Sequence, residues 1–199
     1  MLRYSCLIEF HVTFDHFERV KISMTIELPN LPPVKIELKT TRILCIGSPG
    51  IGKTAILKAL CDPRNVFDGT GDGTSTTVDF YAVNARVNPS TIRRFCFFDT
   101  GGAECLSHIR LELINDADGL LMFYSDKASF LALESRWLVE AKDVVGKIPI
   151  ITCGIRPSPV PDRQATSWAD TRKITHVSCS PQDTAPLLKC LIDTFRVTK

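Results

Sequence analysis

Short apolar runs alternate with segments of helical spacing along most of the chain. Apolar runs bounded by turn residues are typical of buried strands, whereas apolar residues three or four positions apart are typical of helices. The pattern predicts strands at 43–46, 78–87, 92–98, 119–124, 148–153 and 174–178. It predicts helices at 55–60, 105–114, 130–144, 163–169 and 184–195.

Strands and helices that alternate in this order are typical of an α/β fold with a doubly wound sheet and ligand at the carboxyl ends of its strands. We expect a six-stranded, mostly parallel sheet with helices on both faces. The strands 78–87 and 92–98 are joined only by Asn88-Pro89-Ser90, which predicts an antiparallel hairpin.

The first 40 residues precede this pattern. Ile22–Leu28 and Val34–Leu38 alternate apolar and polar residues around Pro29–Pro33, which indicates a hairpin. It either extends the edge of the sheet or forms a loosely ordered arm, and we favour the arm because terminal segments commonly fray. We therefore divide the chain into an N-terminal extension, 1–40, and a domain at 41–199. Met24 is an alternative start that the sequence leaves open.

Composition agrees with a cytoplasmic protein. The 199 residues are 44% hydrophobic, enough for a full α/β core. A net charge of +2 without a lysine or arginine block argues against nucleic acid or an acidic membrane as the main partner. Glu9 and Asp15 interrupt the N-terminal apolar stretch, which argues against a secretory signal. The eight cysteines form no C-x-x-C pair and the four histidines lie at no ligand spacing from them, so we expect reduced thiols rather than zinc ligands.

The strand at 43–46 runs directly into G-x-x-x-x-G-K-T, and a helix follows. This is the context of a phosphate-binding loop, in which glycines let the backbone wrap closely around a polyphosphate. Lys53 would reach the β- and γ-phosphates, and the Thr54 hydroxyl would bind Mg²⁺. The residues expected to line the phosphate site are Gly47, Ser48, Pro49, Gly50, Ile51, Gly52, Lys53, Thr54 and Ala55.

A second chemical signal, Phe97-Phe98-Asp99-Thr100-Gly101-Gly102, ends a hydrophobic strand about 45 residues after Lys53. Asp99 at this point could hold Mg²⁺ through water. The backbone N–H of Gly102 could contact a γ-phosphate and move when that phosphate leaves.

On these motifs, residues 41–199 resemble a Ras-superfamily small GTPase, with Asp99-Thr100-Gly101-Gly102 in place of D-T-A-G. The resemblance implies a P-loop NTPase fold and GTP or GDP with Mg²⁺. Thr76–Tyr81 matches the T-x-x-D-x-Y of switch I, so Thr76 would join Thr54 and Asp99 at the metal. Ser75 or Thr77 takes that role if the register slips, and an edge strand with exposed threonines is the alternative.

Two positions depart from the family at the site of hydrolysis. The family's catalytic glutamine, which orients the attacking water, is replaced by Ala103. A loop position that must stay small holds Pro49. Both changes predict slow or absent hydrolysis, and we assign no catalytic residue.

The motif for base recognition also departs from the family pattern. The family's N-K-x-D is replaced by Ile155-Arg156-Pro157-Ser158, so Ser158 stands in place of the aspartate that accepts two guanine N–H bonds. Losing two charge-assisted bonds would weaken guanine binding by ~10²–10⁴-fold and reduce the preference for guanine over adenine, and we expect Ser158→Asp with Ile155→Asn to sharpen that preference. Arg156 could still lie along the base. The residues expected around the base are Ile155, Arg156, Ser158, Ser178, Cys179 and Ser180.

Among subfamilies, the pair Pro49 and Ala103 resembles the kappaB-Ras proteins, although these normally keep N-K-x-D. The resemblance implies protein effectors or regulators that contact the switch segments, with inhibitors of NF-kappaB and Ral GTPase-activating complexes as candidates. It also implies no lipid anchor, since Cys190 lies ten residues from the end rather than in a prenylation box. Two functions remain open: a slowly hydrolysing nucleotide switch and a pseudo-GTPase interaction module. An ATP-using P-loop enzyme is a weaker third.

Overall fold

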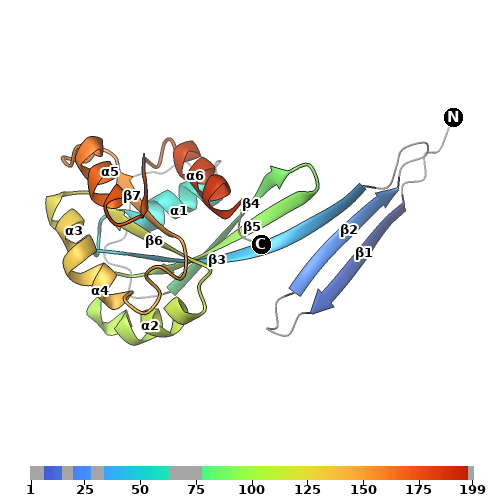
Figure 1. The fold of residues 1–199 in the computed structure, drawn as a ribbon, viewed down its shortest axis with the longest axis horizontal. Helices are drawn as coiled ribbons and strands as arrows, with labels where there is room; N and C mark the ends of the chain where they lie inside the picture. Colours follow the sequence, from blue (N-terminus) through green and yellow to red (C-terminus); the bar gives the residue numbers. More distant parts are fainter. Residues whose placement is uncertain (1–6, 15–19, 28–33, 63–77, 197–199) are drawn as a thin grey trace. The chain divides into compact units, whose positions relative to one another are not determined.

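A computed structural model describes residues 7–14, 20–27, 34–62 and 78–196 (Figure 1). The strands are β1 (Leu7–Phe14), β2 (Val20–Glu27), β3 (Val34–Gly47), β4 (Val78–Asn88), β5 (Thr91–Thr100), β6 (Gly119–Tyr124), β7 (Ile150–Ile155) and β8 (Thr175–Cys179). The helices are α1 (Lys53–Cys61), α2 (Ser107–Asn115), α3 (Lys127–Ala132), α4 (Leu138–Glu140), α5 (Asp162–Asp170) and α6 (Ala185–Phe195). A 3₁₀ turn, η1 (Glu104–Leu106), precedes α2, and a π-helical turn, η2 (Leu133–Trp137), joins α3 to α4.

The sheet follows the order β1-β2-β3-β6-β7-β8, and β5 pairs with both β3 and β4. The pairs β3–β6, β6–β7 and β7–β8 are parallel, whereas β1–β2 and β2–β3 are antiparallel. The six strands from β3 to β8 confirm the predicted α/β fold with a mostly parallel sheet. β1 and β2 bring this sheet to eight strands.

Most predicted elements differ from the observed ones by one or two residues at their ends, and the predicted strand 43–46 is the last part of the longer strand β3. The predicted strand 148–153 is β7, two residues later, because Gly154 and Ile155 still pair with Ser178 and Cys179 of β8. The predicted helix 130–144 is the run of α3, η2 and α4, which ends at Glu140, before the predicted end. It begins earlier, at Lys127, because Asp126 and Ser129 form a capping box in which the Ser129 N–H donates to Asp126 Oδ1 at 2.7 Å.

The chain divides into two compact units, residues 1–41 with 84–95 and residues 42–83 with 96–199. In the first unit, the alternating segments predicted as a hairpin are β2 and the start of β3, which pair with Ile22 opposite Leu38. The Glu37 N–H also donates to the Ser90 carbonyl at 2.8 Å. The structure therefore has paired strands here, and the domain boundary at residue 40 stays a prediction.

The second unit carries the predicted phosphate loop and has helices on both faces of its sheet (Figure 1). On one face, Leu44, Ile46 and Met122 pack with Trp137 and the helices α2, α3, α4 and α5. Successive strand residues point to opposite faces, so Ile43 and Cys45 face the other side, where α1 and α6 lie. None of the helices in the described ranges is long and apolar enough to cross a membrane.

Candidate functional site

The predicted phosphate loop connects β3 to α1, with Gly47 as the last strand residue and Gly52 at the helix start. Gly52 has a φ of 97°, a left-handed conformation that side chains rarely allow. Pro49 and Gly50 at the tip of the loop are exposed, whereas Gly47 is buried. The tip of the loop is thus open to solvent, next to the buried end of β3.

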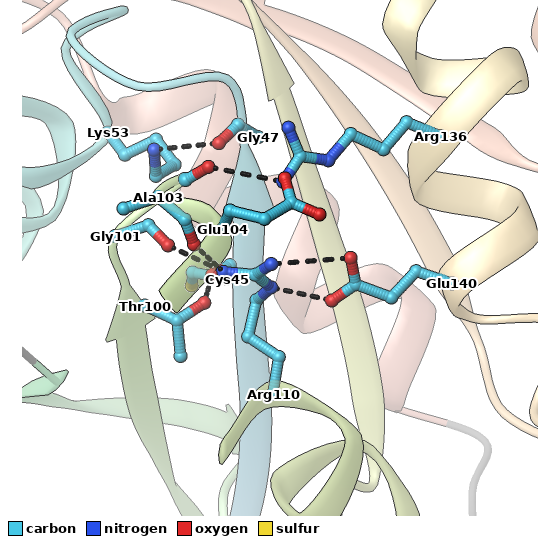
Figure 2. Close-up of polar contacts among 11 residues, drawn as sticks. Cys45, Gly47, Lys53, Thr100, Gly101, Ala103, Glu104, Arg110, Arg136 and Glu140 are labelled. Atoms are coloured by element: carbon cyan, nitrogen blue, oxygen red, sulfur yellow. Dashed lines mark hydrogen bonds and ion pairs between the residues drawn. The ribbon is translucent and has the colours of Figure 1, made fainter. Parts of the chain in front are cut away.

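Lys53 folds back over this loop. Its Nζ donates to the Gly47 carbonyl at 3.0 Å (Figure 2) and to the Ser48 carbonyl at 2.9 Å. The Lys53 side chain is buried. Burial lowers the pKa of Lys53 to about 8, while the nearby Asp99 carboxylate acts in the opposite direction. At pH 7 the ammonium group is therefore still charged, and it lies at the loop where a polyphosphate would bind.

Thr54 and Asp99 lie in direct contact. The Thr54 hydroxyl donates to Asp99 Oδ2 at 2.5 Å, and Asp99 is only 2% exposed. The other oxygen, Asp99 Oδ1, is buried and has no hydrogen-bond partner among the described residues. Burial is the main cause that raises the pKa of Asp99, against the hydrogen bond from Thr54.

Asp99 Oδ1, which has no hydrogen-bond partner among the described residues, is an oxygen that a metal ion could take as a ligand. Mg²⁺ takes hard oxygen ligands and is usually held by one or two carboxylates together with phosphates and water. A hydroxyl and a buried carboxylate oxygen beside the phosphate loop fit that pattern. The described ranges contain no cluster of three or more His, Cys, Asp or Glu side chains that could hold a metal by themselves. Thr76, the third expected ligand, lies outside the described residues, as do Ser75 and Thr77.

The segment after Asp99 packs against the loop. Thr100 donates its hydroxyl proton to the Cys45 carbonyl at 2.8 Å. A Cβ atom placed on Gly102 would contact the Gly47 carbonyl and lie 2.5 Å from the Pro49 nitrogen and 2.7 Å from Pro49 Cδ. Only glycine fits this approach, and the Pro49 ring therefore lies against Gly102.

Sequence reasoning missed the arginine that holds this segment. Arg110 of α2 is 1% exposed, and its Nη1 donates to the carbonyls of Gly101 at 2.9 Å and Ala103 at 2.8 Å (Figure 2). Its Nε donates to Glu140 Oε1 at 2.5 Å. The one signal in the sequence is that Arg110 lies four residues before Ile114, on the buried side of α2.

A second arginine acts on the same backbone. Arg136 of η2 donates to the Gly102 carbonyl at 3.4 Å and to Glu104 Oε2 at 2.9 Å. Arg136 and Arg110 both lie over the Trp137 ring, 4.4 and 5.4 Å from its centroid. We call Arg110, Arg136, Trp137 and Glu140 the arginine clamp, since it fixes the carbonyls of three successive residues, 101–103.

The predicted base site lies at the ends of β7 and β8. Ile155 reaches the phosphate loop, because a Cβ placed on Gly52 would be 3.9 Å from Ile155 Cδ1. Arg156 pairs with Asp162 of α5. The Ser158 hydroxyl accepts from the Val160 N–H at 3.2 Å, within the turn that follows β7.

On β8, Ser178 donates to Asp162 Oδ1 at 2.6 Å. Cys179 is buried, with its Sγ 3.3 Å from that of Cys153, and its carbonyl accepts from the Arg156 N–H at 2.7 Å. The Ser180 N–H donates to the Asp183 carbonyl at 3.2 Å. The structure thus gathers these residues at the ends of two neighbouring strands, together with Asp162, which the sequence did not single out.

The cysteines in the described part of the chain are free thiols at positions 45, 61, 96, 105, 153, 179 and 190. Burial raises the pKa of Cys45 and of Cys61, so these thiols stay protonated at neutral pH.

Comparison with known proteins identifies a family and several relatives, two of which show the extent of the similarity. The sequence model of the Ras family matches residues 42–197. The Rho-related protein racM of Dictyostelium discoideum is 26% identical over 123 residues, which cover 61% of this chain and 63% of racM. Ciliogenesis and planar polarity effector 2 of Homo sapiens is 28% identical over 127 residues, which cover 61% of this chain and 49% of that protein. The chain therefore spans less than two thirds of the length of either relative.

Proposed function

The chain belongs to the Ras family of small GTPases, and on this basis we propose that it binds GTP and GDP with Mg²⁺ and acts as a slowly hydrolysing signalling switch. The observation that carries the proposal is the buried contact of 2.5 Å between the Thr54 hydroxyl and Asp99, next to Lys53. A buried carboxylate with an oxygen left unpaired is costly unless a cation or donor completes it.

The positions of Lys53, Thr54, Asp99 and Gly102 each allow a role in nucleotide binding. Lys53 holds a positive charge at the loop carbonyls, where it would attract the β- and γ-phosphates. Thr54 and Asp99 would hold Mg²⁺, which supplies charge neutralisation to the phosphates when it is bound. Gly102, packed on Gly47 and Pro49, places backbone beside the loop.

Slow hydrolysis follows from the residue after Gly102. Ala103 carries only a methyl group, which cannot orient a water molecule for attack. Its carbonyl is bonded to Arg110, so its backbone is fixed in place as well. The Pro49 ring against Gly102 further fills the space beside the loop.

Protein contacts through the switch segments are the proposed output. Because Pro49 and Ala103 resemble the pattern of kappaB-Ras proteins at these positions, we propose inhibitors of NF-kappaB and Ral GTPase-activating complexes as candidate partners. The human relative is named for ciliogenesis and planar polarity. We propose these processes as a second context in which such protein contacts act. We place the protein in the cytoplasm because the described cysteines are free thiols.

A pseudo-GTPase interaction module is the second candidate. The arginine clamp favours it, because a segment whose carbonyls at 101–103 are all bonded to arginine is poorly suited to move with the nucleotide state. Such a module would keep its pocket empty or hold a nucleotide permanently.

Mass spectrometry of the nucleotide released from purified protein separates these functions. GDP or GTP at about one per chain that exchanges with added nucleotide supports the switch, whereas the same nucleotide held without exchange supports the interaction module. No nucleotide supports the interaction module, and ADP or ATP supports an ATP-using P-loop enzyme. Lys53→Ala, purified in the same way, should release none, while Lys58→Ala on the exposed side of α1 should match the wild type.

A further inference from the structure

The end of β7 lies next to the phosphate loop. Ile155, the last residue of β7, comes within van der Waals distance of the Gly52 position, and β8 is the parallel neighbour of β7. In open α/β sheets, ligands bind outside the carboxyl ends of the strands. A nucleotide whose phosphates occupy the loop would therefore carry its base over the ends of β7 and β8.

A carboxylate lies at the ends of β7 and β8, although the residue at position 158 is a serine. Asp162, the first residue of α5, accepts a hydrogen bond from Ser178 at 2.6 Å through Oδ1 and pairs with Arg156 through Oδ2. Its side chain is 58% exposed, so a ligand can reach it. Arg156 and Ser178 are both residues that the sequence placed around the base.

Asp162 keeps the capacity to accept further donors. An ionised carboxylate offers about four acceptor positions, of which Ser178 and Arg156 use two, and His176 Nε2 lies 3.8 Å from Oδ1. The hydrogen bond from Ser178 is the first cause that lowers the pKa of Asp162, so the group is ionised at neutral pH. Ser158, in contrast, uses its hydroxyl to accept from the Val160 N–H.

We propose that Asp162 is the carboxylate that recognises the guanine base. The inference rests on the proposed function, and it moves base recognition from the loop position 158 to the first turn of α5. Guanine presents two neighbouring donors on its Watson–Crick edge, N1–H and the 2-amino group, and a carboxylate accepts both. Adenine has an acceptor at N1 and no donor at C2, so the same carboxylate disfavours it.

The test is competitive displacement of a fluorescent diphosphate by GDP, ADP and xanthosine diphosphate. Wild-type protein should prefer GDP to ADP. Asp162→Asn should weaken GDP about a hundredfold, because two charge-assisted bonds are lost. It should also strengthen xanthosine diphosphate, whose C2 carbonyl accepts from the new amide. This gain requires a folded protein, so a variant that merely misfolds does not produce it.

Matched variants complete the experiment. Asp170 is exposed at the far end of α5, so Asp170→Asn should change neither the affinity for GDP nor that for xanthosine diphosphate. Ser158→Asp, which leaves Asp162 intact, should change the GDP-to-ADP ratio by less than about threefold. A rise of more than tenfold in the GDP-to-ADP ratio of Ser158→Asp would show that the wild-type protein lacks a carboxylate acceptor for guanine. That result would overturn the inference.

The remaining outcomes separate the inference from the proposed function. Diphosphate binding without base preference in the wild type, or an unchanged preference in Asp162→Asn, overturns the role of Asp162 and leaves nucleotide binding in place. A wild-type protein that binds none of the diphosphates with Mg²⁺ overturns both.

Discussion

The Thr54 hydroxyl and the Asp99 carboxylate lie 2.5 Å apart, although they are 45 residues apart in the sequence. The contact joins the start of α1 to the end of β5, and it leaves Asp99 Oδ1 buried without a partner among the described residues. A protein folded for stability alone gains little from such a group, because the ionised form is desolvated. The arrangement therefore favours a bound cation as its purpose.

The first prediction concerns the stability cost of Asp99. Asp99→Asn should raise the free energy of unfolding by about 0.5–2 kcal/mol at pH 7 without Mg²⁺ or nucleotide. Burial raises the pKa of Asp99, so its cost is absent below the ordinary value near 4 and appears as the pH rises. The gain should therefore shrink toward pH 4.

Urea denaturation of both proteins at several pH values measures this difference. The same variant should lose most of the stabilisation that Mg²⁺ and GDP together give the wild type. An Asn variant that is less stable at pH 7, or equally stabilised by Mg²⁺ and GDP, would contradict the metal role.

The second prediction concerns pH and Lys53. The pKa of Lys53 is lowered to about 8, and bound phosphate would favour the charged ammonium and raise it again. Nucleotide affinity should thus be level near pH 7 and fall by up to about tenfold per pH unit above about 8.

Calorimetry at pH 8.5 in two buffers of different ionisation enthalpy should reveal proton uptake on binding. Lys53→Arg should abolish the uptake, and Lys58→Ala should keep it. An affinity that stays constant from pH 7.5 to 9.5 in the wild type would count against contact between Lys53 and the phosphates.

The third prediction compares the two ion pairs that reach the segment after Asp99. Arg110 and Glu140 are 1% and 15% exposed at their side chains, whereas Glu104, the partner of Arg136, is 87% exposed. Glu140→Ala leaves a buried charge without its partner and should cost about 3–5 kcal/mol of stability. Glu104→Ala should cost less than about 1 kcal/mol. Equal costs in chemical denaturation would show that Glu140 is not needed to hold Arg110.

The phosphate loop could be predicted from the sequence because its chemistry is local. The order of glycines, Lys53 and Thr54 fixes the turn within a few residues, and the apolar strand before it fixes its place in the sheet. Asp99 could be placed for the same reason, since it ends an apolar strand at a suitable distance along the chain. The helix start at Lys127 does not follow from the apolar periodicity, which begins at Phe130, because the capping box of Asp126 and Ser129 sets it.

The arginine clamp and Asp162 could not be predicted in the same way. Arg110 and Glu140 are 30 residues apart, and only the packing of α2 beside α4 brings them together. Asp162 meets Ser178 because the turn after β7 leads directly into α5, a path that composition does not specify. Long-range polar contacts of this kind depend on tertiary geometry rather than on local pattern.

The fourth prediction concerns turnover. Single-turnover hydrolysis of GTP by the wild type should be at or below ~10⁻⁴ s⁻¹, because Ala103 offers no group that orients water. Ala103→Gln should raise the rate. The Ala103 backbone, held by Arg110, does not depend on its side chain, so the variant should fold normally. A wild-type rate near those of activated Ras-type enzymes, with no partner present, would show that another residue positions the water.

The most direct test of the central claim is a calorimetric titration of nucleotide-free protein with GDP and Mg²⁺. Wild type and Lys58→Ala should bind with the same affinity, and removal of Mg²⁺ should weaken that binding. Lys53→Ala should show no measurable binding, because it removes the charge held at the carbonyls of Gly47 and Ser48. Equal binding by wild type and Lys53→Ala would contradict the account.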